Sequence, residues 1–408
     1  MIVIPFLSSH HAPLIRSALA GIGLDCLVVD DSGGQAIARG MESVNNDACY
    51  ASVLSVGQLL SVADGLRDGE RAGCGANTQC GANTQCGGGA MAADAVSSDR
   101  IDVIVSQLCP HCRAGDLSEQ IKRAFESASP ALGCVRSIAE AASMLPAGSL
   151  RRLSEALVLG DALLQAELAV RPHLPDGKRA AFERLIARWR DTMRFWLAQG
   201  SSTPFSSLLE AFDRAVRPFF SCERFGCPLI GVIGAPGAVF NVGINNDLVR
   251  CLEREGCEAA VPYLAPIAAR ALALQKGGER FAEHVEACCE TAAKTMACVR
   301  FPCPSVSELR RRGTEVVPEW VDCGMGWALA GQALLFAEGG VDGIAYARTF
   351  GCLSGHVCGQ GVMKRLREIG NGRGSPVAYA TIEYDPGTSA LNQANRIKLL
   401  AAIARGGS

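Results

Sequence analysis

The pattern of apolar and polar residues changes twice along the chain and divides it into three parts. In residues 1–145, short apolar runs alternate with amphipathic segments. This alternation is typical of parallel strands covered by helices. The predicted strands are Ile2–Phe6, Cys26–Val29 and 102–106, and the predicted helices are Ala12–Ile22, Tyr50–Leu66 and Leu117–Ser127. This first part is therefore predicted to be a Rossmann-like lobe.

The middle part, residues 146–225, carries a helical pattern. Leucines recur on one helical face from Leu153 to Leu168, and a second amphipathic stretch runs from Phe182 to Phe195. Apolar residues at this spacing favour helices with one buried side. We predict a helical insert.

From residue 226 to residue 408 the alternation of the first part returns. The predicted strands are Leu229–Ile233, Ala259–Tyr263, Gly343–Ala347 and Val377–Tyr384, and the predicted helices are Asn246–Glu255, Gly361–Ile369 and one beginning at Ser389. The expected fold class is thus α/β, with two Rossmann-like lobes, parallel sheets and a helical insert between them.

The composition makes nucleic-acid and membrane partners less expected than proteins or small molecules. The chain has 408 residues, 49% of them apolar, and a net charge of −2. This charge gives no electrostatic reason to expect nucleic acid or an anionic membrane. No apolar run approaches the roughly 18 residues of a membrane span, and the first residues lack a basic leader. We expect a cytoplasmic protein.

Nineteen cysteines are the unusual feature of the composition. A chain of this length does not need disulfides to stabilise a small core, so most cysteines are expected to pack as small apolar residues. Cys74, Cys80 and Cys86 belong to a tandem Gly- and Asn-rich repeat within residues 70–95. This repeat is predicted to be a flexible surface loop without fixed ligand geometry.

Three other cysteines, Cys49, Cys112 and Cys352, occupy turns that lead into predicted helices. Sites in parallel α/β sheets form beside the carboxyl ends of the strands, and a helix N-terminus favours the thiolate that a metal requires. Gly351, Gly355 and Gly359 are expected to let the backbone approach a large inorganic group. We therefore predict an iron-sulfur cluster held by the three cysteines.

Two alternatives stay open. Cys109 and Cys112 form a C-x-x-C pair after a predicted strand, which is also the pattern of thioredoxin-like dithiols. Together with Cys352 and Cys358, the same pair would complete a four-cysteine zinc site.

Longer motifs resemble a known family. They are Asn45-Asn-Asp-Ala-Cys-Tyr, Cys112-Arg113, Asn245-Asn246, Gly326-Trp327, Phe350-Gly-Cys-Leu-x-x-His356-Val-x-Gly359 and Glu383-Tyr-Asp-Pro-Gly, the last followed by Asn392-Gln-x-Asn395-Arg-Ile-Lys398. The chain resembles proteins related to 2-hydroxyacyl-CoA dehydratases, and more closely the C-terminal portion of the large activators of 2-hydroxyglutaryl-CoA dehydratase. It departs from the family at Ala51 and Ala235, where proline and an acidic residue are usual.

The resemblance implies a 4Fe-4S-type cluster in an anaerobe, with Cys49, Cys112 and Cys352 as ligands, Cys109 as a substitute ligand and the number of irons left open. It also implies an ATP-dependent activator or dehydratase-like protein as partner, and a small or CoA-linked substrate. The chain has no G-x-x-x-x-G-K-[ST] phosphate loop, so it is not expected to hydrolyse ATP itself.

Three functions follow as hypotheses. The first is a lyase or reductase of the dehydratase type, or a low-potential electron-transfer protein. The second is a cluster carrier or scaffold subunit that docks on the activator, and the third is a C-x-x-C thiol-redox protein. His356 is the candidate donor to a sulfide or a substrate oxygen. His10 and His11 are secondary candidates, and a homodimer is among the expected assemblies.

Overall fold

The computed structural model describes residues 2–5, 8–29, 34–45, 47–67, 100–112, 117–127, 131–200, 202–223, 226–374 and 376–406. The tandem repeat with Cys74, Cys80 and Cys86, and Arg113 beside Cys112, lie outside the described residues.

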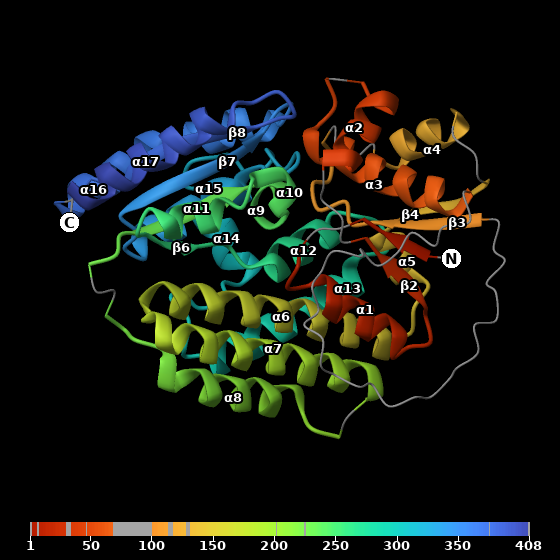
Figure 1. Ribbon diagram of the computed structural model, residues 1–408, viewed down its shortest axis with the longest axis horizontal. Coiled ribbons are helices and arrows are strands. Elements are labelled where there is room, and N and C mark those ends of the chain that lie inside the picture. Colours follow the sequence, from red (N-terminus) through yellow and green to blue (C-terminus); the bar gives the residue numbers. More distant parts are fainter. Residues whose placement is uncertain are drawn as a thin grey trace.

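Two parallel four-stranded sheets confirm the predicted α/β class with two Rossmann-like lobes (Figure 1). The first sheet has the order β2-β1-β3-β4 and the second the order β6-β5-β7-β8. Their strands are β1 (Ile2–Ile4), β2 (Cys26–Val28), β3 (Arg100–Val105), β4 (Ala131–Ser137), β5 (Leu229–Gly234), β6 (Glu258–Ala260), β7 (Gly343–Thr349) and β8 (Ala378–Tyr384). In both sheets the strand order reverses beside the first strand in sequence, and ligands of such sheets bind at that reversal.

Helices cover both sheets and build a separate layer beneath them. They are α1 (Ala12–Ala20), α2 (Gly34–Ser43), α3 (Tyr50–Arg67), α4 (Leu117–Ser127), α5 (Ile138–Ser143), α6 (Ala147–Val170), α7 (Asp176–Gln199), α8 (Phe205–Val216), α9 (Pro236–Phe240), α10 (Val242–Asn245), α11 (Leu248–Arg254), α12 (Leu264–Ala273), α13 (Glu279–Thr295), α14 (Val306–Gly313), α15 (Trp327–Glu338), α16 (Met363–Arg373) and α17 (Ala390–Gly406). Short 3-10 segments follow α6 and α8, and a π-helical turn spans Gly355–Gly359.

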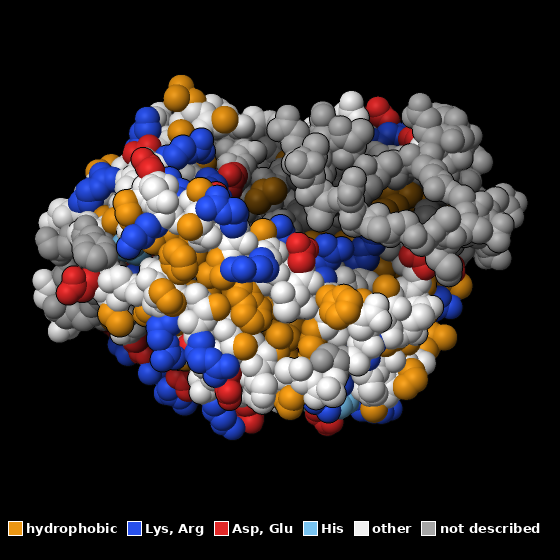
Figure 2. All heavy atoms as spheres, turned by 60° about the horizontal axis from the view of Figure 1, so that its bottom comes forward, with side chains coloured by type: hydrophobic (Ala, Val, Ile, Leu, Met, Phe, Trp, Pro, Cys, Tyr) orange, Lys and Arg blue, Asp and Glu red, His pale blue; other side chains and the backbone are white. Residues whose placement is uncertain are grey.

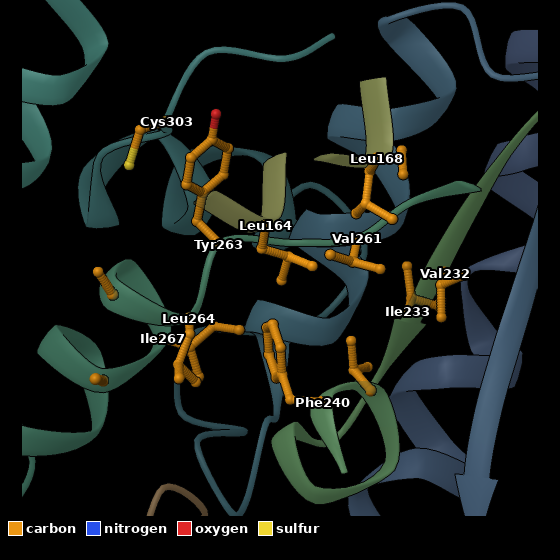
Figure 3. Close-up of a cluster of buried hydrophobic side chains, with 14 of the residues drawn as sticks. Leu164, Leu168, Val232, Ile233, Phe240, Val261, Tyr263, Leu264, Ile267 and Cys303 are labelled. Atoms are coloured by element: carbon orange, nitrogen blue, oxygen red, sulfur yellow. The ribbon is translucent and has the colours of Figure 1, made fainter. Parts of the chain in front are cut away.

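The helices α6, α7 and α8 lie side by side at the bottom of Figure 1. Helix α6 packs against α1 of the first lobe and also against α12 and α13 of the second half of the chain. Its apolar side contributes Leu164 and Leu168 to a core shared with Val232 and Phe240 (Figure 3). The helical part is therefore a layer that joins both lobes.

One buried carboxylate fixes this junction. Asp161 of α6 is 1% exposed and accepts backbone N–H bonds from Leu264 and Ala265 at the start of α12, each at 2.8 Å. Its Oδ1 also lies 3.2 Å from Nε2 of His11, whose Nδ1 is 2.8 Å from the Ser8 hydroxyl. Asp161 thereby ties the β1–α1 turn, α6 and α12 together.

Several elements differ from the sequence-based prediction. Helix α2 and strand β4 were not predicted, because glycines at 34, 40 and 133 weaken their helix and strand patterns. The four helices α12 to α15 were also not assigned. Helix α4 has the predicted bounds, whereas strand β6 begins and ends earlier than expected.

Charges of both signs are interspersed around hydrophobic side chains on the face drawn in Figure 2. This distribution agrees with the near-neutral net charge. None of the described helices has the length and apolar character needed to cross a membrane.

Replacing Asp161 tests the junction. Asp161→Ala leaves two helix N–H groups and His11 without their acceptor, so we expect unfolding in urea to become easier by roughly 3 kcal/mol. The control is Asp191→Ala, because Asp191 is an exposed partner of Arg194. This control should change the free energy of unfolding by less than about 0.5 kcal/mol. Equal effects of the two substitutions would contradict the assignment.

Candidate cysteine site

Four cysteines from both lobes influence one another electrostatically. Cys49 directly precedes α3, Cys109 and Cys112 lie in the turn after β3, and Cys352 follows β7. Burial raises the pKa of Cys109 well above its usual value, and Cys352, Cys49 and Cys112 raise it further. Burial, Cys49 and Cys112 likewise raise the pKa of Cys352, to about 11. The geometry agrees, because a Cβ at Gly324 would lie 2.7 Å from Oγ of Ser354 and 3.5 Å from Cβ of Cys112, and the Ser354 Oγ is 3.8 Å from the Cys352 sulfur.

Backbone and hydroxyl donors surround two of these thiols. Burial raises the pKa of Cys49, whereas the N–H groups of Ala51 and Ser52 and the Thr349 hydroxyl act in the opposite direction. The Cys49 Sγ lies 3.9 Å from Thr349 Oγ1, and the Cys352 Sγ lies 3.8 Å from Ser354 Oγ. The N–H groups at the start of α3 thus act in the predicted direction, but burial outweighs them and the pKa of Cys49 stays above its usual value.

A buried arginine supplies positive charge beside the thiols. Arg270 of α12 is 2% exposed, donates to the carbonyls of Gly324 and Asp322 and lies 4.8 Å from the centre of the Trp327 ring. Burial lowers the pKa of Arg270, and Cys109 is the largest influence in the opposite direction. Its Nε has no hydrogen-bond partner among the described residues. The site thus contains one buried positive charge to set against the charge of a thiolate.

Cys323 is a fifth cysteine of the site that the sequence analysis missed. Its thiol donates to the carbonyl of His111 at 2.9 Å, and burial followed by Cys112 raises its pKa. The next residue, Gly324, donates to the carbonyl of Pro110 at 2.7 Å. The sequence analysis selected cysteines that follow a predicted strand. Cys323 follows neither a strand nor an apolar run, so that criterion could not find it.

The backbone around Cys109 is strained. Gln107 and His111 have φ angles of 40° and 55°, in the left-handed region that side chains disfavour. Strain of this kind persists where the surrounding structure enforces it, often at functional sites.

The glycines after Cys352 make room for a tyrosine ring. A Cβ at Gly355 would collide with the Tyr346 hydroxyl, and one at Gly359 would lie 2.6 Å from Cζ of the same ring. The two glycines therefore admit Tyr346 of β7. The Tyr346 hydroxyl is buried without a hydrogen-bond partner among the described residues, and both it and the Cys352 sulfur approach the position of a Gly355 side chain. Gly351 has a φ of 76° and lies against the backbone of Ala48, which brings the Cys49 and Cys352 turns together.

The side chains of the candidate histidines have partners other than the thiols. His356 is exposed, and its Nδ1 is 3.1 Å from Nη1 of Arg348, which pairs with Glu383. His10 contacts Glu167, and His11 belongs to the Asp161 junction.

Within the described part of the chain, no group of three or more His, Cys, Asp or Glu side chains is arranged to hold a metal ion. This finding applies equally to the four-cysteine zinc alternative and to the three-cysteine cluster. Cys109 and Cys112 are both free thiols, so no disulfide links the C-x-x-C pair.

Substitutions at one glycine pair test the packing behind Cys352. Gly355→Ala forces a methyl group against Tyr346, so we expect unfolding to become easier by about 2 kcal/mol. Gly361→Ala is the matched control, because its Cβ would meet no atom within 4 Å. Tyr346→Phe removes an unpaired buried hydroxyl and should change stability by less than about 1 kcal/mol in urea titrations. A larger loss in Tyr346→Phe would mean that the hydroxyl has a partner in the protein.

A scan of known protein families finds no family model that matches the chain, and a search of curated proteins finds no significant match.

Proposed function

We propose that the chain is an iron-sulfur protein that holds a 4Fe-4S-type cluster through Cys49, Cys112 and Cys352, with Cys109 next to them. The observation that carries the proposal is the approach of three cysteine turns from two lobes. The Cys49 sulfur lies 3.9 Å from Thr349 Oγ1, Gly351 lies against Ala48, and Gly324 lies against both Cys112 and Ser354. Hydrophobic packing alone does not require several thiols from two lobes to lie close together.

The chemistry of the donors supports the cluster. Buried thiols without a cation keep their protons, and soft metals displace protons from such ligands. Backbone N–H groups and the orphan Tyr346 hydroxyl are donors of the kind that bond to cluster sulfur. The Arg270 guanidinium offsets the negative charge that thiolates and sulfide bring. A bound cluster would supply an electron at low potential.

The resemblance to the 2-hydroxyacyl-CoA dehydratase family extends the proposal to a function. We infer low-potential electron transfer or the reductive dehydration of a small or CoA-linked substrate, with an ATP-dependent activator as electron source. Phe350, Leu353 and Val357 beside Cys352 are exposed by 45%, 52% and 68%. Apolar side chains with this much exposed surface support the proposal that a partner protein binds beside Cys352.

Anaerobic reconstitution tests the cluster. We expect the purified chain to take up iron and sulfide and to give an EPR signal on reduction. Cys49→Ser, Cys112→Ser and Cys352→Ser should each reduce the iron content by at least half, because serine is a poor ligand for iron in a cluster. Cys134→Ser is the control, since Cys134 is exposed and lies outside the site.

Two results would decide against the proposal. One is a wild-type chain that binds no iron after anaerobic reconstitution. The other is equal iron loading in Cys134→Ser and in all three site variants. Cys109→Ser adds a separate readout, because a loss of iron equal to that in Cys112→Ser would make both cysteines of the turn ligands.

The role of the cluster can be tested in the loaded protein. If a 2-hydroxyacyl-CoA thioester is the substrate, its addition to the reduced protein should shift the EPR signal, whereas CoA alone should not. An unchanged signal together with electron transfer to an added dehydratase would favour the cluster-carrier function.

A further inference from the structure

A cavity lies apart from the cysteine site. It is lined by the starts of α12 and α14 and by the second half of α15. Its volume is about 550 Å³, within the range of small-molecule sites. Four of its lining residues, Val261, Tyr263, Ile267 and Cys303, are labelled in Figure 3, which draws the hydrophobic cluster beside it. The cavity is large enough for a ring compound and is lined mainly by apolar side chains.

The wall of the cavity is rigid. Four prolines line it: Pro262, Pro266, Pro302 and Pro304. Because a proline ring fixes φ, these segments lose little conformational freedom when a ligand enters. The Tyr263 hydroxyl braces the wall by donating to the carbonyl of Phe301 at 2.6 Å. The cavity is therefore preformed.

One polar side chain in the wall, Gln332, has no hydrogen-bond partner among the described residues. Gln332 lies in α15 among buried apolar residues and is 3% exposed. Neither its amide nitrogen nor its amide oxygen has a hydrogen-bond partner in the part of the chain that the structure describes. Leaving such an amide unpaired destabilises a protein, so a glutamine within an apolar helix is unfavourable for folding alone.

The other polar side chains of the cavity have partners. Ser305 accepts from the backbone N–H of Glu308. Glu308 pairs with Arg311 and Arg312, and Glu338 pairs with Arg312. Because each acid at the rim has a cationic partner, the cavity offers no unpaired charge to a ligand. The expected ligand is therefore uncharged.

We propose that this cavity binds a small, uncharged ring compound that carries a carboxamide or lactam edge, which pairs with the Gln332 amide. Such an edge presents one N–H donor and one carbonyl acceptor side by side, as the glutamine amide does. In the empty cavity the amide nitrogen and oxygen of Gln332 are buried. The amide would reach the ligand by rotating about its last side-chain torsion, whose energy well is broad. The proposal is independent of the iron-sulfur function.

Three probes of similar size test the proposal on the full-length chain: benzamide, toluene and benzoate. By calorimetry or ligand-observed NMR, we expect benzamide to bind with a Kd of about 1 mM, a value suited to a fragment of its size. Toluene should bind at least tenfold more weakly because it cannot pair with the amide, and benzoate should not bind because the cavity would bury its charge unpaired.

Two variants separate pairing from simple burial. Gln332→Leu should weaken benzamide binding about tenfold, leave toluene binding unchanged or stronger, and raise or preserve the thermal midpoint of the free protein. Leu335→Trp fills the cavity from the half-buried side of α15 and should abolish binding of both compounds. This second variant keeps the test valid if Gln332→Leu folds poorly.

The proposal is overturned if benzamide does not bind, if toluene binds as well as benzamide, or if Leu335→Trp binds benzamide like the wild type. It is also overturned if benzamide binds Gln332→Leu and the wild type equally. Iron content after reconstitution should be the same in all variants, so a failure here is distinct from a failure of the cluster proposal.

Discussion

The structure depends on the buried carboxylate of Asp161. A charge with 1% exposure is tolerated only where hydrogen bonds replace the lost water, and here two backbone N–H groups and His11 do so. Among the described residues the two sheets are separate and share no hydrogen-bonded strands. The carboxylate therefore fixes the start of α12 against α6 and against the turn after β1, and α12 carries Arg270 to the cysteines. The same constraint explains Gly160, where any Cβ would collide with the His11 ring.

The sequence predicts the architecture because its signals are local. Apolar strands followed by helices recur in both lobes, and the observed strand orders match each other. What fails is the assignment of segments whose local signal is weak in one respect. Helix α2 is amphipathic but contains two glycines, which lower its helix propensity. Helix α15 is apolar on nearly all sides and lacks the stripe of an ordinary surface helix, so its helical state follows from tertiary packing.

The residues of the candidate site differ in the same way in how well the sequence predicts them. Cys49, Cys112 and Cys352 could be selected because each precedes a helix, which is visible in one stretch of sequence. Arg270, Cys323 and Tyr346 could not be selected from the sequence. They reach the site only through the packing of α12, the loop before α15 and the buried face of β7. The close packing of Gly355 and Gly359 against Tyr346 could not be predicted for the same reason, since Tyr346 belongs to a strand rather than to their own turn.

The contact between Cys49 and Thr349 joins residues that are 300 positions apart in the chain. The turns that carry the thiols are therefore brought together only when both lobes and the helical layer have been synthesised and packed. A nascent chain that contains only the first lobe has Cys49, Cys109 and Cys112 but neither Arg270 nor Cys352. Assembly of the complete site must accordingly be one of the last events of folding, and an inorganic group delivered earlier would meet an incomplete set of ligands.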